Sequence, residues 1–294
     1  MITGKQLIVI GGPTASGKTS LAIAIARHFG TEIISGDSRQ FYQELRIGSA
    51  RPDDGELAAA THHFIADRSV TDPLTAGRFA EEAVAKLETI FAHHDHAILV
   101  GGSGLYLRAL CEGLDAFPEV TDAARTQVQR VGEEQGLPGL QTELERLDPA
   151  YFATVDRHNP RRLERALSVC YTAGQPYSSF LGNRPERPFQ CVYFQPVMDR
   201  PTLYARINRR VDQMLAAGLE AEARALSAHG DLPALQTVGY REWWPYFDGE
   251  YDHDRAVTLI KQNSRRYAKR QTSWFGRGGV YLPVTGLAEA VAKA

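Results

Sequence analysis

Short apolar runs alternate with helix-compatible stretches over the first hundred residues of the chain. The β-branched runs at 6–10 (QLIVI), 32–35 (EIIS) and 97–100 (AILV) predict short buried strands. Helical patterns between them span roughly 19–28 and 76–92. Strands that alternate with helices predict a parallel sheet with crossover helices, whose ligands bind at the carboxyl ends of the strands.

After Gly113 the pattern becomes helical. From about 121 to 173 apolar residues recur at helical spacing, interrupted by Gly136 and Pro138. Strand signals return only at 190–194 (QCVYF), and long helices are then expected at about 200–228 and 254–275. The pattern predicts an α/β fold, a parallel sheet core carrying an all-helical insertion domain. The expected domains are a core of 1–113 and 190–294 and an insertion of 114–189.

Composition narrows the class of protein. The chain has 294 residues, 43% hydrophobic and 23% charged, which is typical of a globular protein and excludes wholesale disorder. Three scattered cysteines do not suggest a disulfide framework or a cysteine zinc site. No apolar run approaches the roughly 20 residues of a membrane helix, and the first residues lack a signal-peptide pattern. We therefore expect a cytoplasmic protein without a membrane partner, and a monomer.

Charge is unevenly distributed along the chain, and this distribution bears on nucleic-acid binding. The net charge of −2 removes the simplest argument for a nucleic-acid binder. Residues 255–277, however, carry seven Lys or Arg and no Asp or Glu, which leaves −9 on the rest of the chain. Val257, Ile260, Tyr267 and Trp274 are expected to dock this helix, leaving its cations for a nucleic acid.

The strongest motif follows the first predicted strand. Residues 12–19 (GPTASGKT) match the phosphate-loop pattern G-x-x-x-x-G-K-[ST], between a strand and a helix as the motif requires. The motif makes the predicted α/β sheet core P-loop NTPase-like. Its backbone N–H groups would cradle phosphate oxygens. Lys18 would reach the terminal phosphate, and the Thr19 hydroxyl would bind Mg²⁺. The full set of predicted phosphate-binding residues is Gly12, Pro13, Thr14, Ala15, Ser16, Gly17, Lys18 and Thr19.

The acid expected of a nucleotide-hydrolysing enzyme is missing from its usual place. The strand at 97–100 ends in GGSGLY, whereas such enzymes usually have an acidic Mg²⁺ ligand there. The acid is instead Asp37, which follows the strand at 32–35. An aspartate after a strand is often only a helix cap. Its expected convergence with the phosphate loop favours a catalytic role.

Several motifs together resemble a known family, the bacterial tRNA dimethylallyltransferases (tRNA isopentenyltransferases). The matching segments are GPTASGKT, GDSRQFY, IGSARP, HHF, VGGSGLY, NPRRLERAL, VGYRE and RRYAKRQTSWF, which occur in the family's order over nearly the whole chain.

The resemblance implies a reaction. A dimethylallyl group passes from dimethylallyl diphosphate to N6 of the adenosine just 3′ of the tRNA anticodon, and diphosphate is released. The catalytic set carried over is Asp37 as general base, Lys18 and Thr19 with Mg²⁺ on the leaving diphosphate, Arg210 as a further phosphate contact, and Ser103 where the family usually has Thr. A carboxylate that accepts the amine proton contributes about 10²–10⁴-fold.

The resemblance also assigns contacts to the anticodon stem-loop of the tRNA. The expected residues are Asp37, Ser38, Arg39, Gln40, Ser103, Arg125, Arg161, Arg162, Leu163, Glu164, Arg165, Gln236, Thr237, Val238, Gly239, Tyr240, Arg241, Lys269, Arg270, Gln271, Thr272, Ser273, Trp274, Phe275 and Gly276. The segment DPLTAGRF at 72–79 departs from the family pattern, which leaves the role of that loop open.

Three alternatives remain at this stage. A nucleoside or small-metabolite kinase would consume ATP and ignore tRNA. A non-catalytic RNA-binding module would not need the phosphate loop or Asp37. An adenylate isopentenyltransferase, which acts on free nucleotides, would not need the basic helix or the insertion.

Overall fold

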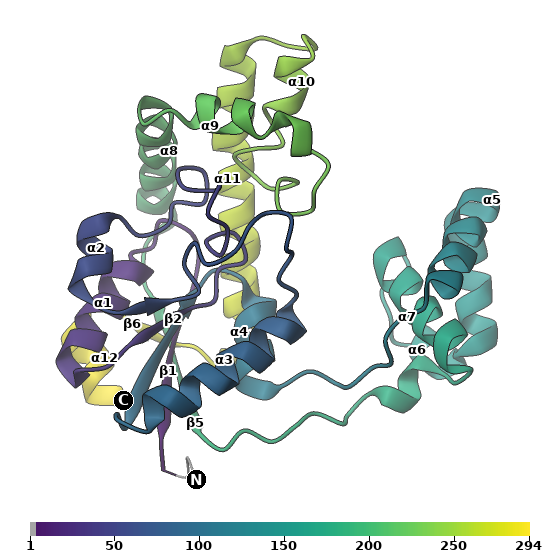
Figure 1. The fold of residues 1–294 in the computed structure, drawn as a ribbon, viewed down its shortest axis with the longest axis horizontal. Coiled ribbons are helices and arrows are strands. Elements are labelled where there is room, and N and C mark those ends of the chain that lie inside the picture. The colour runs from purple at the N-terminus through teal and green to yellow at the C-terminus, as the bar shows by residue number, and fades with distance from the viewer. Residues whose placement is uncertain (1–3) are drawn as a thin grey trace. The chain divides into compact units, whose positions relative to one another are not determined.

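The structure, a computed structural model, describes residues 4–294 of the chain (Figure 1). Within them the strands form a six-stranded sheet in the order β3-β2-β4-β1-β5-β6, with every neighbouring pair parallel. The strands are β1 (Gln6–Gly11), β2 (Ile33–Ser35), β3 (His62–His63), β4 (His96–Gly101), β5 (Gln190–Pro196) and β6 (Leu282–Val284). The parallel α/β sheet predicted from the sequence is confirmed.

Helices cover the sheet. The helices of this part of the chain are α1 (Lys18–Phe29), α2 (Asp54–Ala59), α3 (Ala76–Phe91), α4 (Gly104–Glu112), α8 (Arg200–Ala216), α9 (Leu219–Ala225), α10 (Trp244–Phe247), α11 (His253–Phe275) and α12 (Leu287–Lys293). Both faces of the sheet are buried, because alternate residues of β1 enter different clusters. Leu7 and Val9 pack with residues of α3 and α4, whereas Ile8 and Ile10 pack with residues of α1.

The chain divides into two compact units, residues 1–111 with 187–294 and residues 112–186. The second unit contains α5 (Asp122–Leu147), α6 (Pro149–Phe152) and α7 (Pro160–Ala173). Gly136 interrupts α5 with φ 63° and ψ −158°, as the sequence predicted. Asp148 is only 1% exposed. Its carboxylate caps α6 by accepting the Tyr151 N–H, and it accepts two further hydrogen bonds from Ser178.

Two sequence expectations are wrong in detail. The single helix predicted at 200–228 is broken at Gly218, which has φ 100° and separates α8 from α9. The docking stripe of α11 also differs from the prediction. Its buried residues are Ala256, Ile260, Ala268, Gln271 and Phe275, whereas Trp274 is 37% exposed.

Helix length bears on the membrane prediction. Over residues 4–294, no helix combines the length and the apolar character that crossing a membrane requires.

Candidate active site

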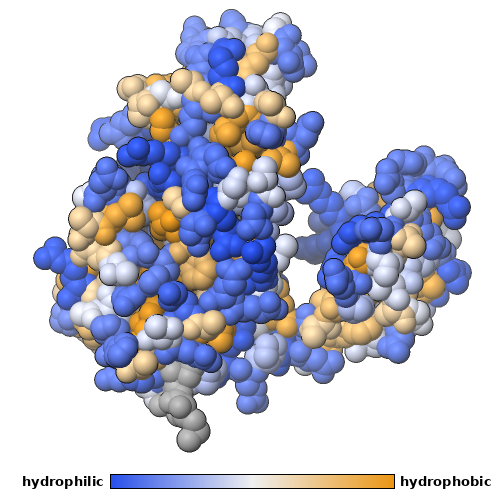
Figure 2. Space-filling model, viewed as in Figure 1, coloured by the Kyte–Doolittle hydropathy of each residue, from blue (hydrophilic) through white to orange (hydrophobic). Residues whose placement is uncertain are grey.

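The carboxyl ends of β1, β2 and β4 lead into one cavity of about 660 Å³. The phosphate loop follows β1, Asp37 follows β2, and Gly101 ends β4. Helix α8 contributes Arg210 to the same cavity, and α11 contributes Tyr267 and Gln271. The surface of this unit in the view of Figure 1 is largely hydrophilic, with hydrophobic residues gathered over α8 and α9 (Figure 2).

The phosphate loop has the backbone conformation of an anion cradle. Gly12, Ala15 and Gly17 all have positive φ, at 144°, 64° and 90°. The Ser16 hydroxyl is buried, and it has no hydrogen-bond partner in the described part of the chain. Lys18 Nζ donates to the Pro13 carbonyl oxygen at 2.6 Å. An orphaned hydroxyl at the N-terminus of a helix is a donor for phosphate oxygens, so the loop fits a phosphate-bearing ligand.

Two cations lie at this end of the cavity. Burial lowers the pKa of Lys18 to about 8, although Asp37 raises it in opposition, and Arg210 lowers it further. Burial also lowers the pKa of Arg210, against the attraction of Glu56 and Asp37. Arg210 donates to the Thr14 hydroxyl at 3.0 Å. A diphosphate placed here would relieve the repulsion between the two cations.

The Asp37 loop is tied to the turn after β4. Asp37 Oδ1 accepts the Arg39 N–H at 3.0 Å. The Ser103 hydroxyl accepts the Ser38 N–H at 3.0 Å and lies 3.0 Å from the Ser38 hydroxyl. Burial, followed by the charge of Asp37, raises the pKa of Tyr267 to about 12. The sequence reasoning did not place Tyr267 in the site, and the only signal was its position in the motif RRYAKRQTSWF.

Gln271 joins two site loops from α11. Its side-chain oxygen accepts the Thr14 N–H at 2.9 Å, and its side-chain amide donates to the Gly102 carbonyl oxygen at 2.9 Å. Glycines let α11 come this close. A Cβ on Gly102 would lie 2.3 Å from Gln271 Nε2, and one on Gly104 would lie 1.9 Å from Trp274 Nε1.

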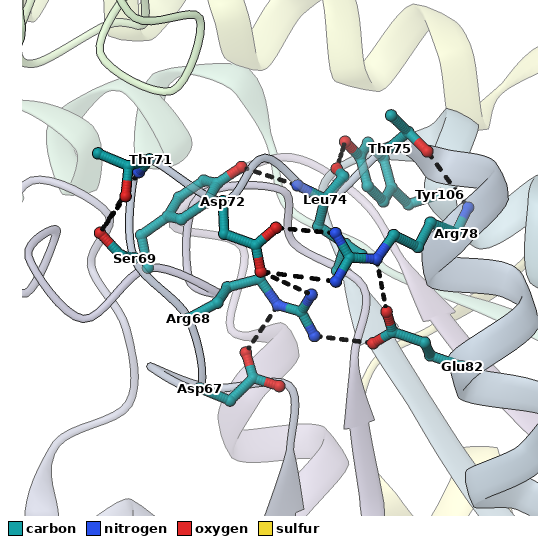
Figure 3. Close-up of polar contacts among 11 residues, drawn as sticks. Asp67, Arg68, Ser69, Thr71, Asp72, Leu74, Thr75, Arg78, Glu82 and Tyr106 are labelled. Atoms are coloured by element: carbon teal, nitrogen blue, oxygen red, sulfur yellow. Dashed lines mark hydrogen bonds and ion pairs between the residues drawn. The ribbon is translucent and has the colours of Figure 1, made fainter.

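Ion pairs join residues 67–82 to one another, and this stretch includes the segment 72–79 whose role the sequence left open (Figure 3). Arg68 pairs with Asp67 at 3.3 Å and with Glu82 of α3 at 2.8 Å, and Arg78 pairs with Asp72 at 2.8 Å. Backbone hydrogen bonds join residues 66–68 to residues 40–43: the N–H groups of 66 and 67 donate to the carbonyl oxygens of 40 and 41, and the N–H of 43 donates to the carbonyl oxygen of 68. The ion pairs therefore hold residues 67–72 to α3, and the backbone hydrogen bonds hold residues 66–68 to the loop after Asp37.

Many residues expected to contact tRNA have exposed side chains. On α11, Lys269, Arg270, Thr272, Ser273 and Trp274 are exposed, as is Gly276 after it. Gln236 and Arg241 are exposed in the first unit, and Arg125, Arg161, Arg162, Glu164 and Arg165 in the second. Residues 37–40, Ser103, Thr237 and Val238 are half-buried.

Four members of that set have side chains that are buried in this structure. Leu163 and Tyr240 are 0% exposed, Phe275 is 1% exposed and Gln271 is 5% exposed. Leu163 belongs to the core of the helical unit. The Tyr240 hydroxyl donates to Glu222 at 2.5 Å, and Gly239 is also buried. Gln271, Gly239 and Tyr240 also line the cavity.

Fold and site together define a phosphate-loop enzyme. Its acidic residue, Asp37, follows β2 and not β4, where the metal-binding acid of such enzymes usually lies. The protein-family model described as IPP transferase matches residues 40–278. A tRNA dimethylallyltransferase of Christiangramia forsetii is 52% identical over 92% of this chain and 89% of its own length. The tRNA dimethylallyltransferase 1 of Bacteroides fragilis is 45% identical over 94% and 92%. This chain belongs to the IPP transferase family.

Solved structures agree with this assignment. The tRNA isopentenylpyrophosphate transferase of Bacillus halodurans superimposes with a TM-score of 0.70 at 32% identity, covering 95% of this chain and 89% of the other. A eukaryotic dimethylallyltransferase acting on tRNA gives a TM-score of 0.82 over 99% of this chain and 76% of the other. At 23% identity the second likeness concerns the fold alone. The resemblance read from the motifs is confirmed.

Proposed function

We propose that this chain transfers the dimethylallyl group of dimethylallyl diphosphate to N6 of the adenosine 3′-adjacent to the tRNA anticodon. The observation that carries the proposal is that Asp37 faces the same cavity as the phosphate loop, Lys18 and Arg210. The phosphate-loop side of that cavity can hold a leaving diphosphate, and the Asp37 carboxylate can accept a proton from an acceptor amine. The 45–52% identity to enzymes named tRNA dimethylallyltransferase supports the choice of group and acceptor.

The leaving group defines one half of the mechanism. The bond between C1 of the dimethylallyl group and the diphosphate oxygen breaks, and negative charge grows on that oxygen. Lys18, Arg210, the Ser16 hydroxyl and the loop N–H groups stabilise this charge without rearranging, because the fold already holds them in place.

The acceptor defines the other half. A bond forms between N6 of adenosine and C1, and the amine must lose a proton. Asp37 accepts it, which is the general-base role expected from the resemblance. Ser103 holds the Asp37 loop, because its hydroxyl accepts the Ser38 N–H. The family usually has threonine at this position, and serine keeps the hydroxyl.

The residues present also fit Mg²⁺. Among residues 4–294, no group of three or more His, Cys, Asp or Glu side chains could hold a metal ion. Mg²⁺ commonly keeps water and binds through substrate phosphates and few protein groups, and the Thr19 hydroxyl in the cavity would be one such group. When bound, the ion would neutralise charge on the diphosphate.

The exposed residues of α11 and of the helical unit provide the proposed tRNA contacts. Lys269 and Arg270 are exposed cations on α11, and Arg161, Arg162 and Arg165 are exposed cations on α7. Anticodon-loop bases are read by stacking and edge hydrogen bonds, and phosphates by Arg and Lys. Moving the target adenine into the cavity costs a few kcal/mol, which these contacts offset.

A coupled assay for released diphosphate tests the proposal. Release from dimethylallyl diphosphate should require unmodified tRNA and should not occur with AMP as the acceptor. ATP hydrolysis that ignores tRNA would favour the kinase alternative. Release with AMP at the same rate as with tRNA would favour the free-nucleotide enzyme.

A further inference from the structure

Glu222 of α9 accepts hydrogen bonds from a turn that forms part of the cavity wall. Its Oε2 accepts the N–H groups of Arg46 and Ile47, at 3.1 and 2.8 Å. Its Oε1 accepts the N–H groups of Ile47 and Gly48, at 3.1 and 3.0 Å. Three consecutive N–H groups around a carboxylate form an anion-binding nest occupied by a side chain of the same protein.

Tyr240 contacts both Glu222 and the turn. The Tyr240 hydroxyl donates to Glu222 Oε1, and a Cβ on Gly48 would lie 2.5 Å from the Tyr240 ring. Glu222 itself does not line the cavity, whereas Arg46, Ile47 and Gly48 do. Any effect of Glu222 on chemistry must therefore pass through its hydrogen-bond partners, which are the turn and Tyr240.

The 46–50 turn is hydrogen-bonded to Gln40, which is one of the residues proposed to contact the target adenosine. The Gln40 side-chain amide donates to the Ala50 carbonyl oxygen at 3.2 Å, and the Ser35 hydroxyl lies 3.3 Å from Gln40 Oε1. Gln40 lies three residues after Asp37. A displaced turn would release one of the contacts that fix the Gln40 side chain and would leave the phosphate loop untouched.

We propose that Glu222 is a positioning residue for the tRNA side of the reaction: it holds the 46–50 turn so that Gln40 presents a fixed amide to the target adenosine. Gly218 separates α8 from α9, and α9 carries Glu222. This inference rests on the proposed function for its kinetic readout and on the hydrogen bonds alone for its structural readout.

Glu222→Gln tests the proposal. The amide keeps the size of the side chain, but its NH₂ group would face backbone N–H donors. We expect kcat/KM for tRNA to fall at least tenfold, while KM for dimethylallyl diphosphate stays within twofold. Tyr240→Phe removes one hydrogen bond, keeps the nest and should give a smaller loss in the same direction. Glu220→Gln, on the same helix and paired with Arg224, is the matched control and should behave as wild type.

Hydrogen exchange gives a readout that does not depend on the activity. The amides of residues 46–48 should exchange at least tenfold faster in Glu222→Gln than in wild type, with no change in Glu220→Gln. Unchanged exchange, or a loss shared equally by both substrates, would overturn the positioning role. If Glu222→Gln exchanges faster but the wild-type protein does not prenylate tRNA, the role of Glu222 in holding the turn stands and the proposed function is rejected. If Glu222→Gln does not fold, the same readouts on Tyr240→Phe decide the question.

Discussion

Gln271 donates a hydrogen bond from its side-chain amide to the carbonyl oxygen of Gly102 at 2.9 Å. Its oxygen simultaneously accepts the Thr14 N–H, so one buried side chain on α11 joins the phosphate loop to the turn after β4. Family resemblance assigned Gln271 to tRNA contact. In the structure Gln271 holds the phosphate loop to the turn that carries Ser103, and it also lines the cavity.

Gln271→Leu should therefore weaken both stability and diphosphate binding. It leaves the Thr14 N–H and the Gly102 carbonyl unpaired, at a cost of about 1–3 kcal/mol for each group that stays buried. Gly102→Ala should act in the same direction, because its Cβ would lie 2.3 Å from Gln271 Nε2, whereas a Cβ on Gly77 meets nothing within 4 Å. Urea unfolding and diphosphate titration of both variants, with Gly77→Ala as the control, check this. Equal stability of all the proteins would refute the bridging role.

Diphosphate binding should take up a proton near pH 8. The pKa of Lys18 is about 8 in the folded protein and 10.5 as its ordinary value, and an anion beside it raises the pKa again. Affinity for diphosphate should therefore fall as pH rises through 8. Stability of the free protein should change in the opposite direction, increasing between pH 8 and 10.5, since the unfolded chain then binds more protons.

Calorimetry in buffers of different ionisation enthalpy measures the uptake. Lys18→Met is the control, because the proton uptake of diphosphate itself remains in that variant. Identical uptake by wild type and Lys18→Met would exclude Lys18 as the titrating group.

Asp37→Asn should remove turnover and keep tRNA binding. The amide has the size of the carboxylate but cannot accept the N6 proton, so kcat should fall about 10²–10⁴-fold. Asp54→Asn removes another carboxylate that lines the cavity and should retain activity. Single-turnover rates and filter binding separate the two effects. Near-wild-type turnover by Asp37→Asn would dismiss Asp37 as the base.

Replacing Lys269 and Arg270 with alanine should weaken tRNA binding and make it less sensitive to salt. Each lost phosphate contact reduces the slope of log K against log salt by about 0.7–0.9. Arg255→Ala with Arg277→Ala removes the same charge from exposed positions outside the predicted contact set. An equal change of slope in both double variants would mean that only the total charge matters.

Strand positions could be predicted from the sequence because apolar β-branched runs end at glycines, and the site could be located because three such ends meet in a parallel sheet. The break at Gly218 was missed, since the apolar spacing of 200–228 continues across it and only the positive φ of the glycine interrupts the helix. The two-residue strand β3 and the late strand β6 are too short to give a pattern.

Side-chain burial within motifs was harder to predict. Leu163, Tyr240 and Phe275 lie in motifs associated with tRNA contact, yet their side chains are buried. A motif keeps both the residues that touch a ligand and those that hold them in place, and sequence alone does not separate the two. Glu222 shows the converse: it lies outside the motifs quoted above, and only the folded chain brings it to the 46–48 turn.

The central claim is that a dimethylallyl group moves to N6 of one adenosine in tRNA. Incubation of the wild-type protein with dimethylallyl diphosphate, Mg²⁺ and unmodified tRNA, followed by mass analysis of the digested nucleosides, tests it most directly. We predict an adenosine heavier by one prenyl group, mapping beside the anticodon and absent with Asp37→Asn. Unmodified adenosine throughout, from a folded protein that binds both substrates, would contradict the account.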